Sequence, residues 1–98
     1  MKVDFNKELL ETICQKWNIV ELAVFGSVLR SDFNEKSDVD VLVKFGETSE
    51  ISLLDIVEIK SELENLFKRE VDVLELQAVK NPFRRKNILS NVEVLYAA

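Results

Sequence analysis

The chain has 98 residues, 47% of them hydrophobic and 32% charged, which predicts a single folded domain over residues 1–98. Its net charge of −5 disfavours direct binding to nucleic acid, and its lack of His excludes imidazole metal sites, imidazole bases and Ser-His triads. No apolar stretch approaches the roughly 20 residues that span a bilayer, so we expect no membrane segment.

The predicted elements alternate between helix and strand, because apolar residues recur at helical spacing in some segments and form short runs in others. In chain order they are a helix over residues 7–17, a strand over 20–25, a short helix over 27–31, a polar loop over 32–36, a strand over 38–45, a helix over 53–68, a strand over 70–76, a short basic helix that starts at Asn81-Pro82 and a strand over 92–96. This order indicates an α/β fold, or an α+β fold with a mixed sheet flanked by helices.

The helices also carry expectations about burial. Cys14 lies on the apolar side of the first helix, so we expect a buried thiol. As the single cysteine it cannot form an internal disulfide, which favours a cytoplasmic protein. Trp17, Tyr96 and the Phe residues are expected in the core rather than stacked on a base. The residues that the helix over 53–68 is expected to bury are Leu53, Ile56, Val57, Leu63, Leu66 and Phe67.

Two carboxylates stand at the head of the second predicted strand, in Ser37-Asp38-Val39-Asp40. Because strand side chains alternate, Asp38 and Asp40 project to one face, about 7 Å apart. The long helix after this strand predicts a parallel crossover, which places the start of the third strand, and with it Asp72, beside Asp40. We therefore expect three carboxylates at one end of the sheet.

Such a cluster needs an explanation, because each pair at ~5 Å repels by roughly 3 kcal/mol at an effective dielectric of ~20. The plain interpretation is that Asp40 and Asp72 lie on a solvated face. The matching V-D-V patterns and the upstream Gly-Ser favour a metal site instead. An all-oxygen cluster suits Mg²⁺ or Mn²⁺ better than Zn²⁺, and Mg²⁺ takes further ligands from substrate phosphates. We predict Asp38, Asp40 and Asp72 as metal ligands.

Gly26-Ser27 follows the first predicted strand and precedes a short helix. Gly lets the backbone approach a ligand closely, and helix N–H groups bind phosphate. Arg30, one turn later, supplies a planar cation to the same region. Taken alone, Ser27 is a helix cap and Arg30 a surface charge. Beside the carboxylates they become candidate nucleotide-binding groups.

With these residues the sequence resembles the nucleotidyltransferase superfamily that includes DNA polymerase beta, and most of all the minimal nucleotidyltransferase (MNT) proteins of prokaryotes. The resemblance covers nearly the whole chain. It implies a nucleotidyltransferase fold, a mixed sheet flanked by helices, with two Mg²⁺ ions and a nucleoside triphosphate held by its phosphates. The family pattern, Gly-Ser, a nearby Arg, Ser-Asp-x-Asp before an apolar strand and a later Asp, is met by Gly26, Ser27, Arg30, Ser37, Asp38, Asp40 and Asp72.

The resemblance also implies roles and a partner. Asp38 and Asp40 would bind both metals, while Asp72 would bind the catalytic metal and help to deprotonate the attacking hydroxyl. Many minimal proteins are antitoxins paired, in a toxin–antitoxin complex, with a HEPN-domain RNase toxin. The implied function is transfer of AMP from ATP to a toxin tyrosine, in a type VII-like toxin–antitoxin pair.

Two other functions stay open from the sequence. One is nucleotidyl transfer to a small hydroxylated molecule such as an aminoglycoside, which usually needs a further domain or a dimer. The other is a non-catalytic antitoxin that binds its partner, for which a facing acidic triad is unnecessary. The basic cluster Arg84, Arg85 and Lys86 is interpreted mainly as a solvated helix end, with contact to nucleotide phosphates or an acidic partner as the alternative.

Overall fold

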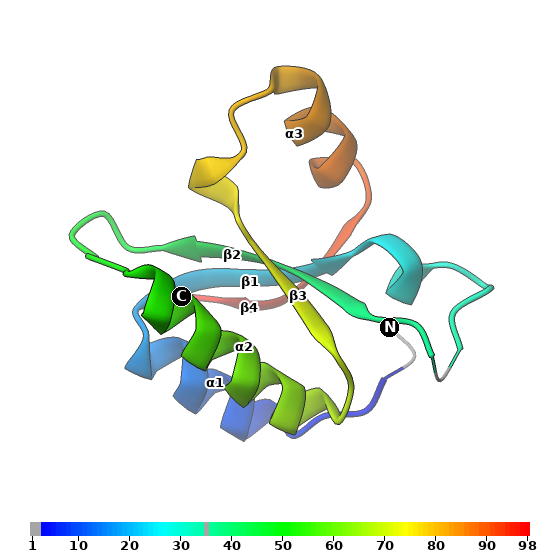
Figure 1. The fold of residues 1–98 in the computed structure, drawn as a ribbon, viewed down its shortest axis with the longest axis horizontal. Helices are drawn as coiled ribbons and strands as arrows, with labels where there is room; N and C mark the ends of the chain where they lie inside the picture. The colour runs from blue at the N-terminus through cyan, green and yellow to red at the C-terminus, as the bar shows by residue number, and fades with distance from the viewer. Residues whose placement is uncertain (1–2, 35) are drawn as a thin grey trace.

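The computed structural model describes residues 3–34 and 36–98. In it, four strands form one mixed sheet in the order β3-β2-β1-β4 (Figure 1). The predicted sequence of helices and strands is confirmed. In chain order the elements are α1 (Lys7–Lys16), β1 (Ile19–Phe25), the 3-10 helix η1 (Gly26–Leu29), β2 (Val39–Phe45), α2 (Leu53–Phe67), β3 (Val71–Glu75), the 3-10 helix η2 (Leu76–Ala78), α3 (Pro82–Leu89) and β4 (Val92–Ala97).

The strand directions follow from the lengths of the connections. The crossover through α2 makes β2 and β3 parallel, as predicted, while the shorter connection from β1 leaves β1 and β2 antiparallel. The last strand returns to the other side of β1, also antiparallel. This topology brings the end of β1 and the starts of β2 and β3 to the same end of the sheet.

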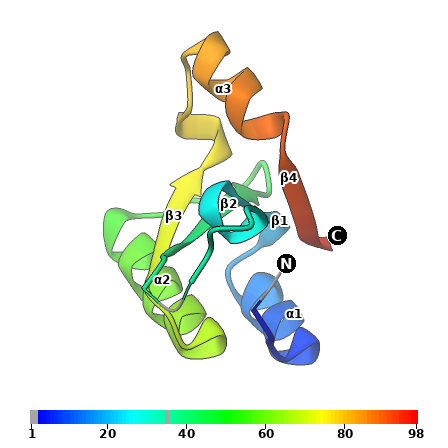
Figure 2. The same ribbon diagram turned by 90° about the vertical axis from the view of Figure 1, so that its right-hand side faces the viewer.

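The core lies between one face of the sheet and the helices α1 and α2, whereas α3 lies on the other side of the sheet (Figures 1 and 2). Alternation along β2 sends Val39, Val41 and Val43 into this core, where all three are completely buried. Their neighbours Asp40 and Lys44 therefore project to the opposite face. Cys14 is buried in α1, as expected, and burial raises the pKa of its thiol to about 12.

The expected burial of α2 is partly wrong. Leu53 is 81% exposed and Val57 57% exposed, whereas Ile59, which was not expected in the core, is fully buried. The reason is the rotation of the helix about its axis. At about 100° per residue, Val57 lies roughly 140° from the direction that Ile59 and Leu63 share with the rest of the buried face. The apolar residues of α2 thus form two stripes, and the sheet covers one of them.

In the part of the chain that the structure describes, no helix is both long enough and apolar enough to cross a membrane.

Candidate functional site

The site begins where β1 ends at Gly26. Gly26 has a φ of 73°, in the left-handed region that favours glycine, and a Cβ there would overlap the carboxylate of Asp40. The chain turns at this point into η1, one residue earlier than predicted and as a 3-10 helix. Without a side chain at Gly26, the backbone can lie directly against a carboxylate of the neighbouring strand.

Ser27 joins η1 to the start of β2. Its hydroxyl donates a hydrogen bond to the backbone oxygen of Asp38 at 3.2 Å. Its backbone N–H donates to Asp40 and holds the pKa of that carboxyl down, although larger effects oppose it. The Gly-Ser turn and the Asp-x-Asp segment are thus one hydrogen-bonded unit, 11 residues apart in sequence at the Ser27–Asp38 bond.

The three predicted carboxylates gather at this end of the sheet. Asp40 and Asp72 are direct partners in the β2–β3 register, on strands that lie about 4.8 Å apart. Burial raises the pKa of Asp40 above its ordinary value of 3.8, and the negative charges of Asp72 and then Asp38 raise it further. The Ser27 N–H and the Arg30 guanidinium lower the pKa of Asp40, without reversing its rise. Asp40 is therefore a carboxylate with too little positive charge around it.

The donor chemistry of this cluster fits a hard divalent cation, because Asp40 and Asp72 offer only oxygens and face each other across neighbouring strands. Within the described residues, however, no group of three or more acidic, His or Cys side chains is arranged to hold a metal ion. The assignment of Asp38, Asp40 and Asp72 as ligands stays a prediction. What the structure shows is their proximity and their mutual repulsion.

Arg30, predicted as a nucleotide-binding residue, lies close enough to the cluster for its charge to lower the pKa of Asp40. Its Nε donates to Asp32 Oδ1 at 3.2 Å, and both side chains are largely exposed. Arg30 also borders a hollow of about 260 Å³ between η1 and α3. The other lining residues are Phe25, Gly26, Asn87, Ile88 and Asn91. Sequence reasoning missed Asn87, Ile88 and Asn91, since only the return of the chain from α3 into β4 places them beside Gly26.

Ser37, predicted as a nucleotide-binding residue, helps to build the loop before β2. Its hydroxyl accepts a hydrogen bond from Asn34 N–H at 3.2 Å. Arg69, which the sequence analysis did not select, holds the same loop from the end of α2. Its Nη1 donates to the oxygens of Asn34 at 2.7 Å and Ser37 at 3.4 Å, and its guanidinium stacks 4.5 Å from the centre of the Phe33 ring.

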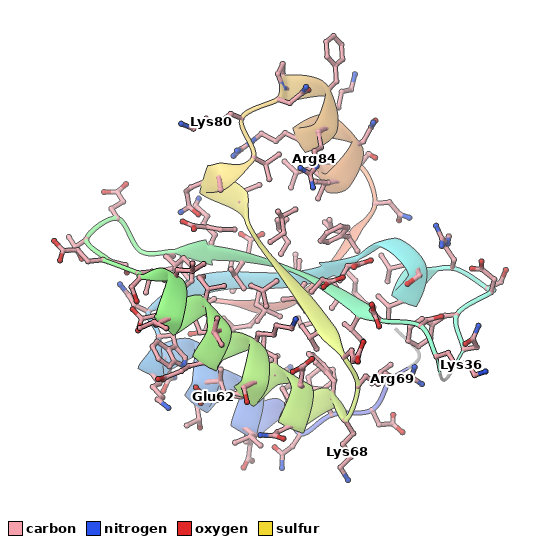
Figure 3. All side chains as sticks on the ribbon, in the orientation of Figure 1. Lys36, Glu62, Lys68, Arg69, Lys80 and Arg84 are labelled. Atoms are coloured by element: carbon pink, nitrogen blue, oxygen red, sulfur yellow. The ribbon has the colours of Figure 1, made fainter. Side chains whose placement is uncertain are left out.

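This set of contacts, which we call the Arg69 clamp, ties α2 to the loop that leads into Asp38. In Figure 3, Arg69 points from the end of α2 toward the loop that carries Lys36. Beside the clamp, Val39 N–H donates to Glu70 O at 3.0 Å. Arg69 therefore belongs with the site as a positioning residue.

The three basic residues of α3, Arg84, Arg85 and Lys86, differ in burial and in contacts. Arg85 is half-buried and donates to the backbone oxygens of Leu76 at 3.0 Å and Val79 at 3.3 Å. It holds η2 against α3, which corrects the interpretation of Arg85 as part of a solvated helix end. Arg84 and Lys86 are exposed, as that interpretation predicts, and Figure 3 labels Arg84 on α3.

Comparison with known sequences gives a family. Residues 6–95 match the model of the nucleotidyltransferase domain. A Methanocaldococcus jannaschii protein, provisionally named a protein adenylyltransferase, is 38% identical over 96 residues, which cover 97% of this chain and 100% of that protein. The protein adenylyltransferase MntA of Thermococcus cleftensis is 39% identical over 75 residues, covering 76% of this chain and 70% of that protein.

Comparison with solved structures agrees. A provisionally named minimal nucleotidyltransferase superposes with a TM-score of 0.72 at 33% identity, over 89% of this chain and 86% of the other. A chain of a toxin–antitoxin complex with AMP-PNP superposes with a TM-score of 0.74 at 15% identity, over 95% of this chain and 74% of that chain. At that identity the likeness shows the fold alone. The domain match, the relatives and the minimal nucleotidyltransferase structure together show that this chain belongs to the nucleotidyltransferase family.

Proposed function

We propose that this nucleotidyltransferase is an antitoxin that uses Mg²⁺ and ATP to transfer AMP to a tyrosine of a HEPN-domain RNase toxin. The observation that carries the proposal is the pairing of Asp40 with Asp72 beside the Gly26 turn, in a chain whose relatives are named protein adenylyltransferases. A chain of the same fold occurs in the solved complex of a tri-AMPylated Shewanella oneidensis HEPN toxin with MNT antitoxin. That complex supports a toxin as the partner.

Different residues of the site bind the triphosphate, the nucleoside and the metal. The Gly26 turn lets the backbone approach the triphosphate closely, Ser27 holds Asp38 and Asp40 beside it, and Arg30 adds its cation on the same side. The hollow that Asn87, Ile88 and Asn91 help to line receives the nucleoside. Bound divalent metal would neutralise phosphate charge at Asp38, Asp40 and Asp72.

The transfer itself is a substitution at the α-phosphorus of ATP. The tyrosine oxygen forms a bond to the α-phosphorus, and the bond between that phosphorus and the bridging oxygen breaks, so pyrophosphate leaves. The hydroxyl proton passes to the carboxylate of Asp72. Asp72 is suited to this because it is exposed on the edge strand β3, where an acceptor protein can reach it.

The test uses ATP labelled on the α-phosphate, Mg²⁺ and a HEPN-domain RNase toxin as the acceptor. Label should appear on a toxin tyrosine, located by peptide mass spectrometry. Asp38→Asn and Asp40→Asn should each lower the transfer rate more than about 100-fold, because each removes a predicted metal ligand. Asp4→Asn is the matched control, since Asp4 is an exposed carboxylate of the N-terminal segment. Undiminished labelling by both variants would contradict the mechanism.

The same variants separate catalysis from simple binding. If the Asp38→Asn/Asp40→Asn double variant still neutralises the toxin fully in cells, contact alone is sufficient and the transfer role is wrong. If neutralisation disappears while a pull-down still recovers the toxin, transfer is the function.

A further inference from the structure

Three neighbouring apolar side chains at the start of α2 lie exposed. Leu53 is 81%, Leu54 76% and Val57 57% exposed, and we call these three residues the α2 patch. A helix of a folded domain usually turns its apolar residues to the core, and a cluster left in water marks an interaction site. The patch is also where sequence reasoning about burial failed, which is common at functional surfaces.

The helix that carries the α2 patch is capped at its start and buried along its opposite side. Ser52 and Asp55 form a capping box: Asp55 N–H donates to Ser52 Oγ at 3.1 Å, and Ser52 N–H donates to Asp55 Oδ2 at 3.0 Å. On the opposite side of α2, Ile59 and Leu63 are fully buried. Rotation of α2 to cover the patch would expose this buried face, so the patch is a stable feature of the folded chain.

The charges around the patch are mainly negative. Glu58 lies one turn after Leu54 on α2, and Glu50 lies in the loop that leads into the helix; both are exposed. Lys60 is the cation on the next turn. A second copy of this chain would bring like carboxylates together, on molecules with a net charge of −5 each. A basic partner, by contrast, is attracted to this rim.

A hollow adjoins the patch. It measures about 420 Å³, and its charged lining residues are two carboxylates and one cation, Glu47, Glu75 and Lys44, beside Ile51. Since Ile51 lies two residues before Leu53, the hollow and the patch are neighbours on the chain. A partner that covers the α2 patch can therefore place one further side chain in a preformed recess next to Glu47.

The patch lies far from the carboxylate cluster. Figure 1 shows that α2 begins beside the end of β2 and ends at the start of β3, and its 15 residues span about 22 Å. Asp72 lies just beyond the far end of α2. A partner docked on the patch leaves Asp38, Asp40 and Asp72 open, so docking and catalysis use separate surfaces.

We propose that the α2 patch docks the acceptor protein through an amphipathic helix whose apolar side chains are flanked by Lys or Arg. The identity of the occupant as the acceptor rests on the proposed function, while the existence of the docking surface rests on the patch and its acidic rim. Docking at one end of α2 would hold the acceptor while its tyrosine reaches the carboxylates at the other end.

The binding experiment needs no transfer activity. The probe is a fluorescently labelled peptide of Leu and Lys at helical spacing, and its partner probe carries Glu in place of Lys. Anisotropy should show that the Lys peptide binds the wild-type chain and the Glu peptide does not. Leu53→Gln/Leu54→Gln keeps every charge and should weaken binding of the Lys peptide about tenfold. The control, Leu9→Gln/Phe83→Gln, changes two side chains that are 48% and 79% exposed elsewhere and should leave binding unchanged.

With the HEPN-domain protein as acceptor, the Leu53→Gln/Leu54→Gln variant should raise the KM for that protein about tenfold and leave kcat unchanged. Equal Lys-peptide affinity for wild type and variant would overturn the proposal, as would equal binding of the Lys and Glu peptides. A wild-type dimer in sedimentation velocity that the variant loses would assign the patch to a second copy. Binding to phosphatidylcholine vesicles that the variant loses would assign it to a lipid surface.

Asp40→Asn separates the two proposals. It should bind the Lys peptide as wild type does but transfer no AMP. Retained transfer by Asp40→Asn would contradict the proposed function but not the docking surface. Equal binding of the Lys peptide to the wild type and to Leu53→Gln/Leu54→Gln would contradict the docking surface but not the proposed function.

Discussion

Asp40 is the residue on which the charges of the site act most clearly. Burial, then Asp72, then Asp38 raise its pKa above 3.8. A carboxyl whose pKa is raised by folding contributes stability only at low pH, and that stability is lost as the pH rises from 3.8 through the raised pKa. At neutral pH without divalent cations, ionised Asp40 therefore opposes folding.

Asp40→Asn should raise the melting temperature of the metal-free chain at neutral pH by about 1–5 °C, because it removes this repulsion. Calorimetry in the presence of EDTA measures the change. The gain should shrink as the pH falls toward 3.8, where the wild-type carboxyl is protonated as well. Asp4→Asn, at an exposed position away from the cluster, serves as the control. A lower melting temperature for Asp40→Asn at neutral pH would show that Asp40 is adequately compensated without metal.

At the scale of elements, the Arg69 clamp connects the end of α2 with the loop before β2. The planar guanidinium donates to two backbone oxygens and stacks on Phe33 at once, which a Lys ammonium does not reproduce. The loop leads directly into Ser37 and Asp38, so its conformation sets where the first carboxylate lies.

Arg69→Ala should destabilise the fold by about 1–2 kcal/mol, since it removes charge-assisted hydrogen bonds that are partly screened from water. It should also raise the Mg²⁺ concentration for half-maximal AMP transfer several-fold, because Asp38 is no longer held. Arg69→Lys should recover the stability only in part. Lys60→Ala, on an exposed face of α2, is the control for loss of a cation. An unchanged Mg²⁺ requirement in Arg69→Ala would limit Arg69 to a role in folding.

At the scale of the whole molecule, the three carboxylates come from β3, from β2 and from the residue just before β2, so a cation bound among them would link distant parts of the chain. Ligand that binds only the folded state stabilises it by RT ln(1 + [L]/Kd), about 2.7 kcal/mol at 100 times Kd. For a chain of 98 residues this corresponds to a rise of about 10–20 °C in melting temperature.

Saturating Mg²⁺ with a non-hydrolysable ATP analogue should therefore raise the melting temperature of the wild type by about 10–20 °C. The rise should be nearly absent in Asp38→Asn/Asp40→Asn. Differential scanning fluorimetry with and without Mg²⁺ makes the comparison. Equal rises in wild type and double variant would place the metal and nucleotide elsewhere on the molecule.

Short-range patterns were enough to predict much of this molecule from the sequence. Ser52 and Asp55, three residues apart, form hydrogen bonds to each other at the start of α2. Asn81 caps α3 by accepting hydrogen bonds from the N–H groups two and three residues later. Strand alternation places Asp40 on the opposite face from Val39 and Val41. The length of α2 between two strands dictates the parallel crossover that pairs Asp40 with Asp72. Each of these depends on local geometry or connection length, so the fold and the carboxylate cluster could be predicted.

Only the tertiary structure decided the rest. The rotation of α2 on the sheet, which leaves Leu53 and Leu54 in water, depends on how its whole inner face packs. The clamp of Arg69 on Asn34 joins residues 35 positions apart, and the hollow beside Gly26 needs the return of the chain from α3. The physical reason is common to all three: periodicity and capping act over about one helical turn, whereas packing rotation and long-range contacts are chosen by the assembled core.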